Sequence, residues 1–222
     1  MTLRERENRI FDKYRCRAEG EPFIPDGAIS EEYEASRTRL LVILKEPNDS
    51  TGNWAKSGGD IRDFFAWGGR GATSMNLARW SALYDNPLLS MEEIDVSNRK
   101  KRVEHLCRIA VVNLKKIAGG STAQPKEIRE YAEKYWDLLE KQFKLYRPKL
   151  TIAGGVFDTL VALRGSSVVP QEGLRFPYFE DQDLGLCISF YHPQPRFRQR
   201  NQSLFDYLKQ QLNYHQRLNH RN

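Results

Sequence analysis

Four short apolar segments stand apart from the polar remainder of the chain. They are LLVIL at 40–44, IAVVN at 109–113, LTIAG at 150–154 and LCISFY at 186–191. Each segment is continuously apolar and does not alternate with polar residues, as is typical of parallel strands that are covered on both faces. The pattern therefore predicts a central, mostly parallel four-stranded sheet.

Helical patterns lie between and after these segments. Residues 127–146 place apolar side chains at the spacing of one helix face. Ser90 and Glu93 resemble a capping box that opens the helix before the second strand. Residues 155–163 predict a short helix, and residues 203–216 predict a closing helix with an inward apolar face. Strands that alternate with helices predict a three-layer α/β/α domain.

The length of 222 residues favours a single domain, here 1–222. Within it, residues 1–38 predict an N-terminal helix and an extended connector, and residues 39–216 predict the core. Residues 45–74 hold six of the 15 glycines together with several aromatic rings. This composition predicts a long loop beside the first strand, and such loops are often functional.

Composition and motifs exclude several classes of protein. No apolar run approaches the roughly 18 residues that span a bilayer, and residues 1–15 lack the apolar centre of a signal peptide. We therefore expect no membrane partner and a location in the cytosol, or in the nucleus of a nucleated cell. Cys16, Cys107 and Cys187 fit neither a disulfide framework nor metal-ligand spacing. The chain also lacks the P-loop, the dinucleotide-binding glycine motif and G-x-S-x-G.

The distribution of charge changes this picture. The formal net charge is +6 and the isoelectric point is about 9.2. From His192 to the end the chain carries a single acid, Asp206, among several Arg and Lys residues, whereas residues 19–34 are acidic. A basic segment of this kind predicts a polyanionic partner.

Residues that can carry chemistry follow each predicted strand. In open α/β sheets, ligands bind beyond the carboxyl ends of the strands. The residues at these ends are Glu46-Pro47, Asn113, Gly154-Gly155 and His192-Pro193. Because parallel strands end at the same edge of a sheet, we expect these groups to lie close together.

This constellation resembles the uracil-DNA glycosylase superfamily. There an acid or Asn before a Pro ends the first strand, an Asn ends the second, a Gly-led helix follows the third, and His-Pro-x-Pro ends the last. The order and spacing match from about residue 39 to residue 212. The resemblance implies a monomeric, monofunctional DNA glycosylase that flips out one base, hydrolyses its N-glycosidic bond and leaves an abasic site. It implies no metal or organic cofactor, and three cysteines are too few for the four-cysteine iron–sulfur cluster of one branch.

The resemblance also implies roles for individual side chains. Glu46 orients a water or stabilises positive charge on the sugar; otherwise it is a solvated loop carboxylate. His192, as a neutral imidazole, donates to the base oxygen where negative charge develops, or it packs at a strand end. Asn113 reads the Watson–Crick edge of the flipped base, or it caps its strand. Phe64 or Phe65 stacks on the base, unless both rings belong to the core.

DNA contacts are expected around these residues. Pro193 and Pro195 stiffen the loop that carries His192. Arg196 lies where relatives often place an apolar wedge that fills the hole left by the flipped base. The other residues expected at DNA are Lys115, Lys116, Gly154, Gly155, Arg198 and Arg200. The lysines and arginines neutralise phosphates in this interpretation, and a basic, solvated loop is the alternative for the two arginines.

Asn48 distinguishes this chain from the best-known uracil-specific relatives, which have a Tyr after the motif proline. That Tyr blocks pyrimidines that carry a group at ring position five. The smaller Asn48 beside Pro47 leaves room, so the expected substrate is a uracil-like or 5-substituted pyrimidine, met in repair or in defence against foreign modified DNA. Two other functions stay open: a catalytically silent nucleic-acid-binding protein on this fold, and a hydrolase or transferase that acts on free nucleotides.

Overall fold

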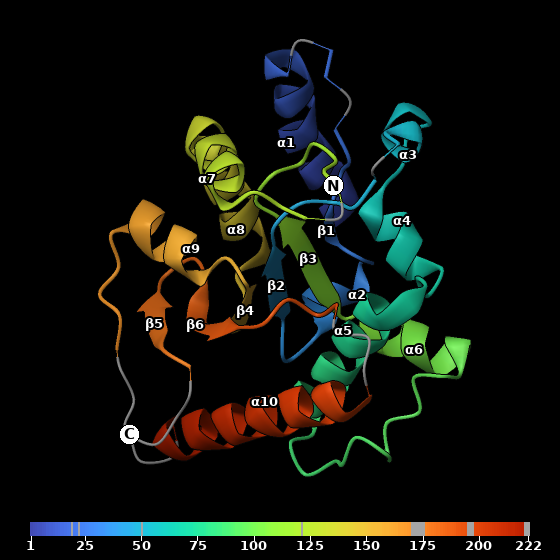
Figure 1. Cartoon of the computed structure of the whole chain (residues 1–222), viewed down its shortest axis with the longest axis vertical. Coiled ribbons are helices and arrows are strands. Elements are labelled where there is room, and N and C mark those ends of the chain that lie inside the picture. Colours follow the sequence, from blue (N-terminus) through green and yellow to red (C-terminus); the bar gives the residue numbers. More distant parts are fainter. Residues whose placement is uncertain are drawn as a thin grey trace.

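A mixed six-stranded sheet forms the centre of the protein, with strand order β1-β3-β2-β4-β6-β5 (Figure 1). The strands are β1 (Gly27–Ala28), β2 (Leu40–Leu44), β3 (Ile109–Asn113), β4 (Leu150–Gly154), β5 (Tyr178–Asp181) and β6 (Gly185–Phe190). The computed structural model describes residues 1–18, 20–21, 23–49, 51–120, 122–169, 176–194 and 198–219. Of residues 198–201 and 216–219 it describes the backbone alone.

The four predicted strands are present and run parallel, but the prediction of a four-stranded sheet is wrong in number. β3, β2, β4 and β6 pair in parallel, and Leu44 lies opposite Asn113 at the carboxyl ends. β1 and β5 add one antiparallel strand at each edge. β1 has only two residues and β5 ends in two acids, so no continuous apolar segment marks either edge strand in the sequence.

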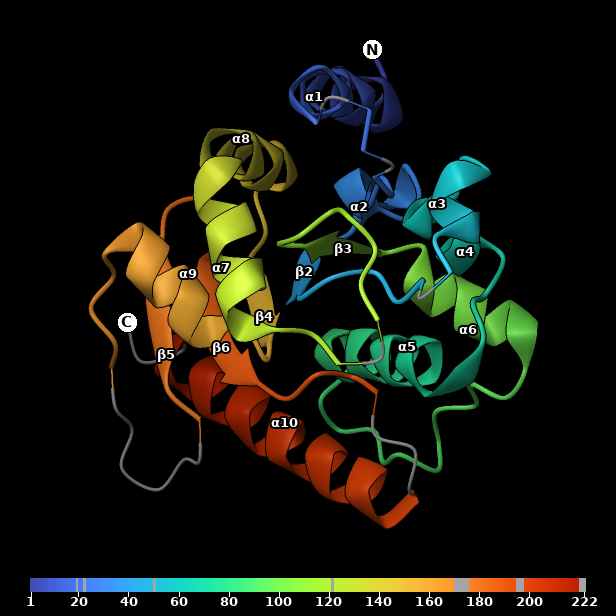
Figure 2. The ribbon, with the colours of Figure 1, turned by 45° about the horizontal axis from the view of Figure 1, so that its top comes forward.

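Helices cover both faces of the sheet, an arrangement compatible with a three-layer α/β/α fold (Figure 2). In chain order they are α1 (Leu3–Arg17), α2 (Glu32–Ala35), α3 (Asn53–Lys56), α4 (Ile61–Ala66), α5 (Gly71–Asp85), α6 (Arg99–Leu106), α7 (Pro125–Lys134), α8 (Trp136–Tyr146), α9 (Phe157–Arg164) and α10 (Arg198–Asn219). Alternate side chains of β2 point into two separate apolar cores, so each face of the strand is buried. Within the described residues, no helix combines the length and the apolar composition needed to cross a membrane.

Two helix predictions and one loop prediction need correction. The single helix predicted at 127–146 is two helices, α7 and α8, because Tyr135 leaves the helical region with φ −113° and ψ 18°. Ser90 and Glu93 do exchange capping bonds, but they close a turn. The helix itself, α6, begins nine residues after Ser90, at Arg99, where the Asn98 side chain accepts from two backbone N–H groups. The glycine-rich region 45–74 contains α3, α4 and the start of α5 and is not one long loop.

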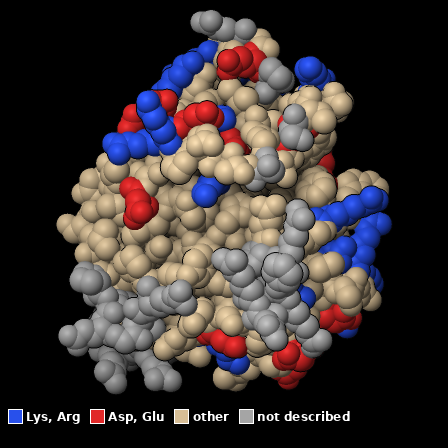
Figure 3. Space-filling view, viewed as in Figure 1, with Lys and Arg blue, Asp and Glu red and all other residues tan. Residues whose placement is uncertain are grey.

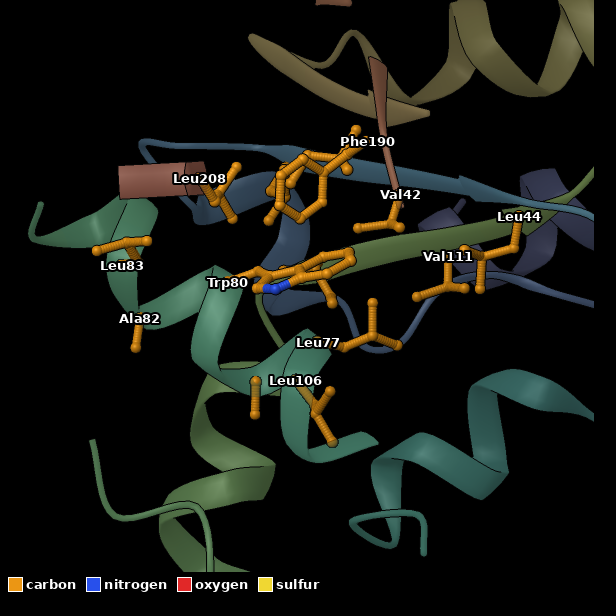
Figure 4. Packing of buried hydrophobic residues seen from close by; sticks show 14 of the residues in the cluster. Val42, Leu44, Leu77, Trp80, Ala82, Leu83, Leu106, Val111, Phe190 and Leu208 are labelled. Atoms are coloured by element: carbon orange, nitrogen blue, oxygen red, sulfur yellow. The ribbon is translucent and has the colours of Figure 1, made fainter. Parts of the chain in front are cut away.

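The core that contains Val42 of β2 packs α5 against the sheet. Trp80 of α5 meets Phe190 of β6 edge to face, with ring centroids 5.3 Å apart (Figure 4). Val42 and Val111 of the sheet and Leu77 of α5 belong to the same buried cluster. This packing sets the distance between α5 and the carboxyl edge of the sheet, where the candidate site lies.

Candidate functional site

A cavity of about 1250 Å³ lies at the carboxyl ends of β2 and β3 and beside the end of β6. Its lining includes seven residues predicted for the site: Glu46, Pro47, Asn48, Phe64, Phe65, Asn113 and His192. These residues come from three strand ends and from α4, so they meet only in the folded chain. The volume exceeds the roughly 300–1,000 Å³ of an ordinary small-molecule pocket, so a ligand larger than an unsubstituted base fits.

Glu46 is held in the cavity wall by the loops that follow β2 and β3. Backbone bonds join these loops, from Lys115 N to Lys45 O at 2.9 Å and from Gly119 N to Pro47 O at 2.9 Å. The Glu46 side chain is 6 % exposed, and Lys115 Nζ donates to its Oε2 at 2.8 Å. A Cβ on Gly119 would lie 2.1 Å from the Glu46 Cδ, so any larger residue at this position would displace the carboxylate.

Lys115 is the counterion of Glu46. Its Nζ also donates to Glu127 Oε2 at 3.2 Å. Burial lowers the pKa of Lys115, but the two carboxylates outweigh burial and raise this pKa above its ordinary value. Lys115 therefore carries a charge that is already shared between two acids. Its predicted contact with a DNA phosphate stays a prediction.

Asn113 ends β3 with its orientation fixed by Asp26. The backbone N of Asn113 donates to Asp26 Oδ2 at 2.7 Å, and its side-chain Nδ2 donates to the same oxygen at 3.3 Å. Because a carboxylate only accepts, the amide nitrogen must be the end that faces Asp26. The carbonyl oxygen Oδ1 is therefore the end of the carboxamide opposite Asp26, available to accept a hydrogen bond from a ligand in the cavity.

Lys116 is fully buried, which contradicts the prediction that it neutralises a DNA phosphate. Its Nζ donates to Asp26 Oδ1 at 2.6 Å and to Gln142 Oε1 at 2.9 Å. Burial lowers the pKa of Lys116, and the Asp26 charge opposes that shift. Lys116 therefore supports Asn113 through Asp26, in a role that the sequence did not indicate.

The buried polar network continues away from the cavity to α1. Gln142 Nε2 donates to Asp26 Oδ1 at 3.0 Å and to the Tyr146 hydroxyl at 2.9 Å. That hydroxyl donates to Glu7 Oε1 at 2.7 Å, and Glu7 pairs with Arg62 of α4 at 2.7 Å. Burial raises the pKa of Glu7, while Arg62 and the Tyr146 bond lower it. The network ties the wall of the cavity to the N-terminal helix.

His192 follows β6 and faces the cavity as a neutral imidazole. Burial, helped by the nearby Lys45 charge, lowers the pKa of His192 from 6.5 to about 4. The adjacent backbone is fixed by α5, because Asn76 Nδ2 donates to Pro193 O at 2.9 Å. Arg79 in turn donates to Asn76 Oδ1 at 3.0 Å. A neutral histidine on a supported backbone is suited to donate a hydrogen bond to a ligand.

Three aromatic rings form one wall of the cavity. Trp54 and Phe64 meet edge to face at 5.9 Å, and Phe64 and Phe65 do so at 5.2 Å. Phe64 is 40 % exposed whereas Phe65 is 5 % exposed. Of the two rings predicted to stack on a base, Phe64 therefore has the accessible surface, and Phe65 belongs to the core.

The glycines after β4 shape a turn. A Cβ on Gly154 would lie 2.6 Å from the Leu44 Cδ2, and Gly155 has a φ of +74° that favours glycine. The described lining of the cavity includes neither residue. Their predicted DNA contact is untested, as is that of Arg198 and Arg200, whose backbone begins α10. Arg196 lies outside the described residues.

Several lining residues were not predicted from the sequence. They are contributed by α5 and by the segment before α6, and include Arg79, Met91, Glu92, Asp95 and Ser97. The guanidinium Nε of Arg79 is buried and has no hydrogen-bond partner in the part of the chain that the structure describes. Among the described residues, no cluster of three or more His, Cys, Asp or Glu side chains is arranged to hold a metal ion.

Figure 3 shows where charged side chains lie on one face of the molecule. Lys and Arg gather over α6, whereas acidic and basic side chains intermingle over α7.

No protein-family model matches the chain, and no curated protein does. The interpretation of the site therefore depends on the groups that it brings together: the Glu46 carboxylate, the Asn113 amide and the His192 imidazole.

Proposed function

We propose that the protein is a DNA glycosylase that excises a uracil-like or 5-substituted pyrimidine from DNA. The observation that carries this proposal is the convergence of a carboxylate, an amide and a neutral imidazole on one cavity at the carboxyl ends of β2, β3 and β6 in the parallel part of the sheet. The resemblance to the uracil-DNA glycosylase superfamily supports it through the same residue types in the same chain order.

The reaction is hydrolysis of the N-glycosidic bond. The base departs with the bonding electron pair, positive charge develops on the sugar, and water adds to the sugar carbon. Glu46 accepts the hydrogen bond of that water and stabilises the sugar cation. One proton of the water goes finally to the departing base, so the products are a free base and an abasic site.

Recognition of the base falls to Asn113 and His192. The Asn113 Oδ1, turned away from Asp26, accepts from an N–H on the pyrimidine edge. Neutral His192 donates to the base oxygen, where negative charge develops as the bond breaks. Phe64 supplies the stacking surface. Asn48 and the volume beyond it accommodate a group at ring position five.

The test is strand breakage by alkali after incubation with labelled DNA. The substrates carry uracil, a thymine mispair or a bulky 5-substituted cytosine, since alkali breaks the strand only where a base has been removed. We expect breaks at one base type, lost in Glu46→Gln and in His192→Ala. Glu127→Gln is the matched control, because Glu127 shares Lys115 with Glu46 but does not line the cavity. Intact strands with every substrate would overturn the proposal.

The volume of the main cavity, about 1250 Å³, also admits a whole nucleotide, which favours one alternative: a hydrolase or transferase that acts on a free nucleotide. Such an enzyme would bind DNA weakly and with little dependence on salt, whereas phosphate contacts impose a steep dependence. A catalytically silent nucleic-acid-binding protein would show the salt dependence without any breaks. Binding measured at two salt concentrations beside the excision assay separates the three functions.

A further inference from the structure

A tryptophan directly after α4 is unusually exposed. Trp67 is 72 % exposed, whereas tryptophan side chains are highly buried on average. It borders a second cleft of about 750 Å³. The Arg99 guanidinium lies 5.2 Å from the centroid of the Trp67 ring and covers one of its faces. The exposure of the side chain leaves the other face open to solvent.

The turn that carries Trp67 is held in place from α6. Arg99 Nε donates to Trp67 O at 2.8 Å, and Arg102 Nε donates to Gly68 O at 2.8 Å. Gly68 and Gly69 have φ values of +94° and +55°, which other residues rarely adopt. Two arginine bonds to consecutive carbonyl groups therefore fix the backbone beneath an exposed ring. Such preorganisation lowers the entropic cost of binding a ligand.

The second cleft adjoins the main cavity. Trp54, Phe64 and Arg70 line both. Arg70 is exposed, and among the described residues no carboxylate pairs with it. The acids of the cleft are otherwise engaged, since Asp60 pairs with Arg62 at 2.6 Å and Arg4 pairs with Asp63. The cleft thus offers an open aromatic face beside cationic groups.

We propose that this cleft binds the single-stranded nucleotide next to the one held in the main cavity. The base stacks on the open face of Trp67, and Arg70 and Arg99 contact the phosphates on either side. Stacking on an aromatic ring beside a cation suits any base, so the cleft binds nucleic acid without sequence preference. The inference rests on the proposed function in taking nucleic acid as the partner and in placing the neighbouring nucleotide in the main cavity.

The first test uses a fluorescein-labelled oligodeoxyadenylate, which offers bases for stacking and no pyrimidine for excision. Trp67→Ala should weaken its binding roughly 5- to 150-fold, the range typical of one base–aromatic stack. Arg70→Gln should lower the slope of log affinity against log salt by about 0.7, as expected for one phosphate contact on a single strand. Unchanged affinity in Trp67→Ala, or no binding by the wild-type protein, would overturn the inference.

Intrinsic tryptophan fluorescence distinguishes stacking of a base on Trp67 from a purely structural role of that residue. Trp54 also lines the cleft, so the measurement is made in a Trp54→Phe background. There, binding of the unlabelled oligonucleotide should quench the emission of the protein that keeps Trp67, with or without Trp136→Phe, but not of Trp67→Phe. Trp136 is the matched control, because it too lies beneath an arginine, Arg164 at 5.5 Å, but lines neither cavity. Quenching that persists in Trp67→Phe would contradict stacking on this ring.

The excision assay separates this inference from the proposed function. If the protein breaks no strand yet binds the oligonucleotide through Trp67, the cleft is supported and the glycosylase is not. If excision is found and Trp67→Ala changes neither oligonucleotide affinity nor KM, the glycosylase is supported and the cleft is not.

Discussion

Replacement of Asp26 by Asn tests whether the buried network supports the site. The Asp26 carboxylate is fully buried, and each of its oxygens accepts two hydrogen bonds. Oδ1 accepts from Lys116 Nζ at 2.6 Å and Gln142 Nε2 at 3.0 Å, and Oδ2 accepts from Asn113 N at 2.7 Å and Nδ2 at 3.3 Å. In Asp26→Asn the side-chain NH₂ replaces one of these two oxygens, so it faces two hydrogen-bond donors whichever way the amide is turned. Lys116 also loses its counterion.

The expected cost is large because a buried charge is left without its partner. Removal of one member of a buried ion pair typically lowers the free energy of unfolding by about 3–5 kcal/mol. With a urea m-value of about 2.5 kcal/mol/M, the urea midpoint should fall by roughly 1.5 M. Far-UV circular dichroism during urea unfolding measures this shift. Asp12→Asn is the control, since its pair with Arg15 is exposed and its loss should leave the midpoint unchanged.

The double variant Asp26→Asn with Lys116→Met sharpens the test. It removes both charges, so its cost should be smaller than the sum of the two single costs and smaller than that of Asp26→Asn alone. A single-variant cost below about 1 kcal/mol, or additive costs, would refute the account of a buried, coupled pair.

Three further predictions concern the cavity. Gly119→Ala places a Cβ against the Glu46 carboxylate and should slow single-turnover excision about 100-fold. In the control Gly120→Ala the new Cβ meets nothing within 4 Å, so the excision rate should be unchanged. Equal rates in the two variants would contradict the role of the contact between Gly119 and Glu46. The pKa of His192 is lowered from 6.5 to about 4, so the imidazole is neutral above pH 5 and kcat/KM should not fall as the pH is lowered through 6.5. A fall near pH 6.5 that disappears in His192→Gln would contradict this. Asn76→Ala removes the amide that donates to the Pro193 carbonyl and should lower the free energy of unfolding, measured in urea, by about 1–3 kcal/mol. A loss well below that range would show that another donor replaces the Asn76 amide.

The sequence predicted the parallel part of the sheet and the elements that meet at its edge. Continuous apolar segments identify buried parallel strands because both faces are covered, and parallel strands bring their carboxyl ends together whatever the loops do. The sequence therefore predicts Glu46, Asn113 and His192 at one edge of the sheet, and all three line the cavity there. β1 and β5 were missed because short edge strands depend on pairing with β3 and β6 more than on their own composition.

Contacts between distant segments explain the other errors. Lys115 and Lys116 are adjacent and identical in type, but the first faces Glu46 and the second is buried against Asp26, 90 residues earlier. No local pattern separates two such lysines. Ser90 and Glu93 form the predicted hydrogen bonds, but no helix begins there. The segment between Glu93 and α6 is held instead by tertiary contacts, since side chains such as Ile94 are buried in the core and line the cavity.

The N-terminal segment acquires its partners late during synthesis. Glu7 bonds to Tyr146 and Asp26 to Gln142, and β1 pairs with β3, so residues 1–28 cannot complete their contacts until α8 has been made. At about 5–20 residues per second, the intervening stretch of about 120 residues takes roughly 6 to 24 seconds to translate. Throughout that interval Glu7 lacks its bond from Tyr146, Asp26 lacks its bond from Gln142, and the face of α1 that packs on α8 stays uncovered. A nascent chain that ends before α8 should therefore be cut by proteases within its first helix, a vulnerability that disappears once residue 146 has joined the fold.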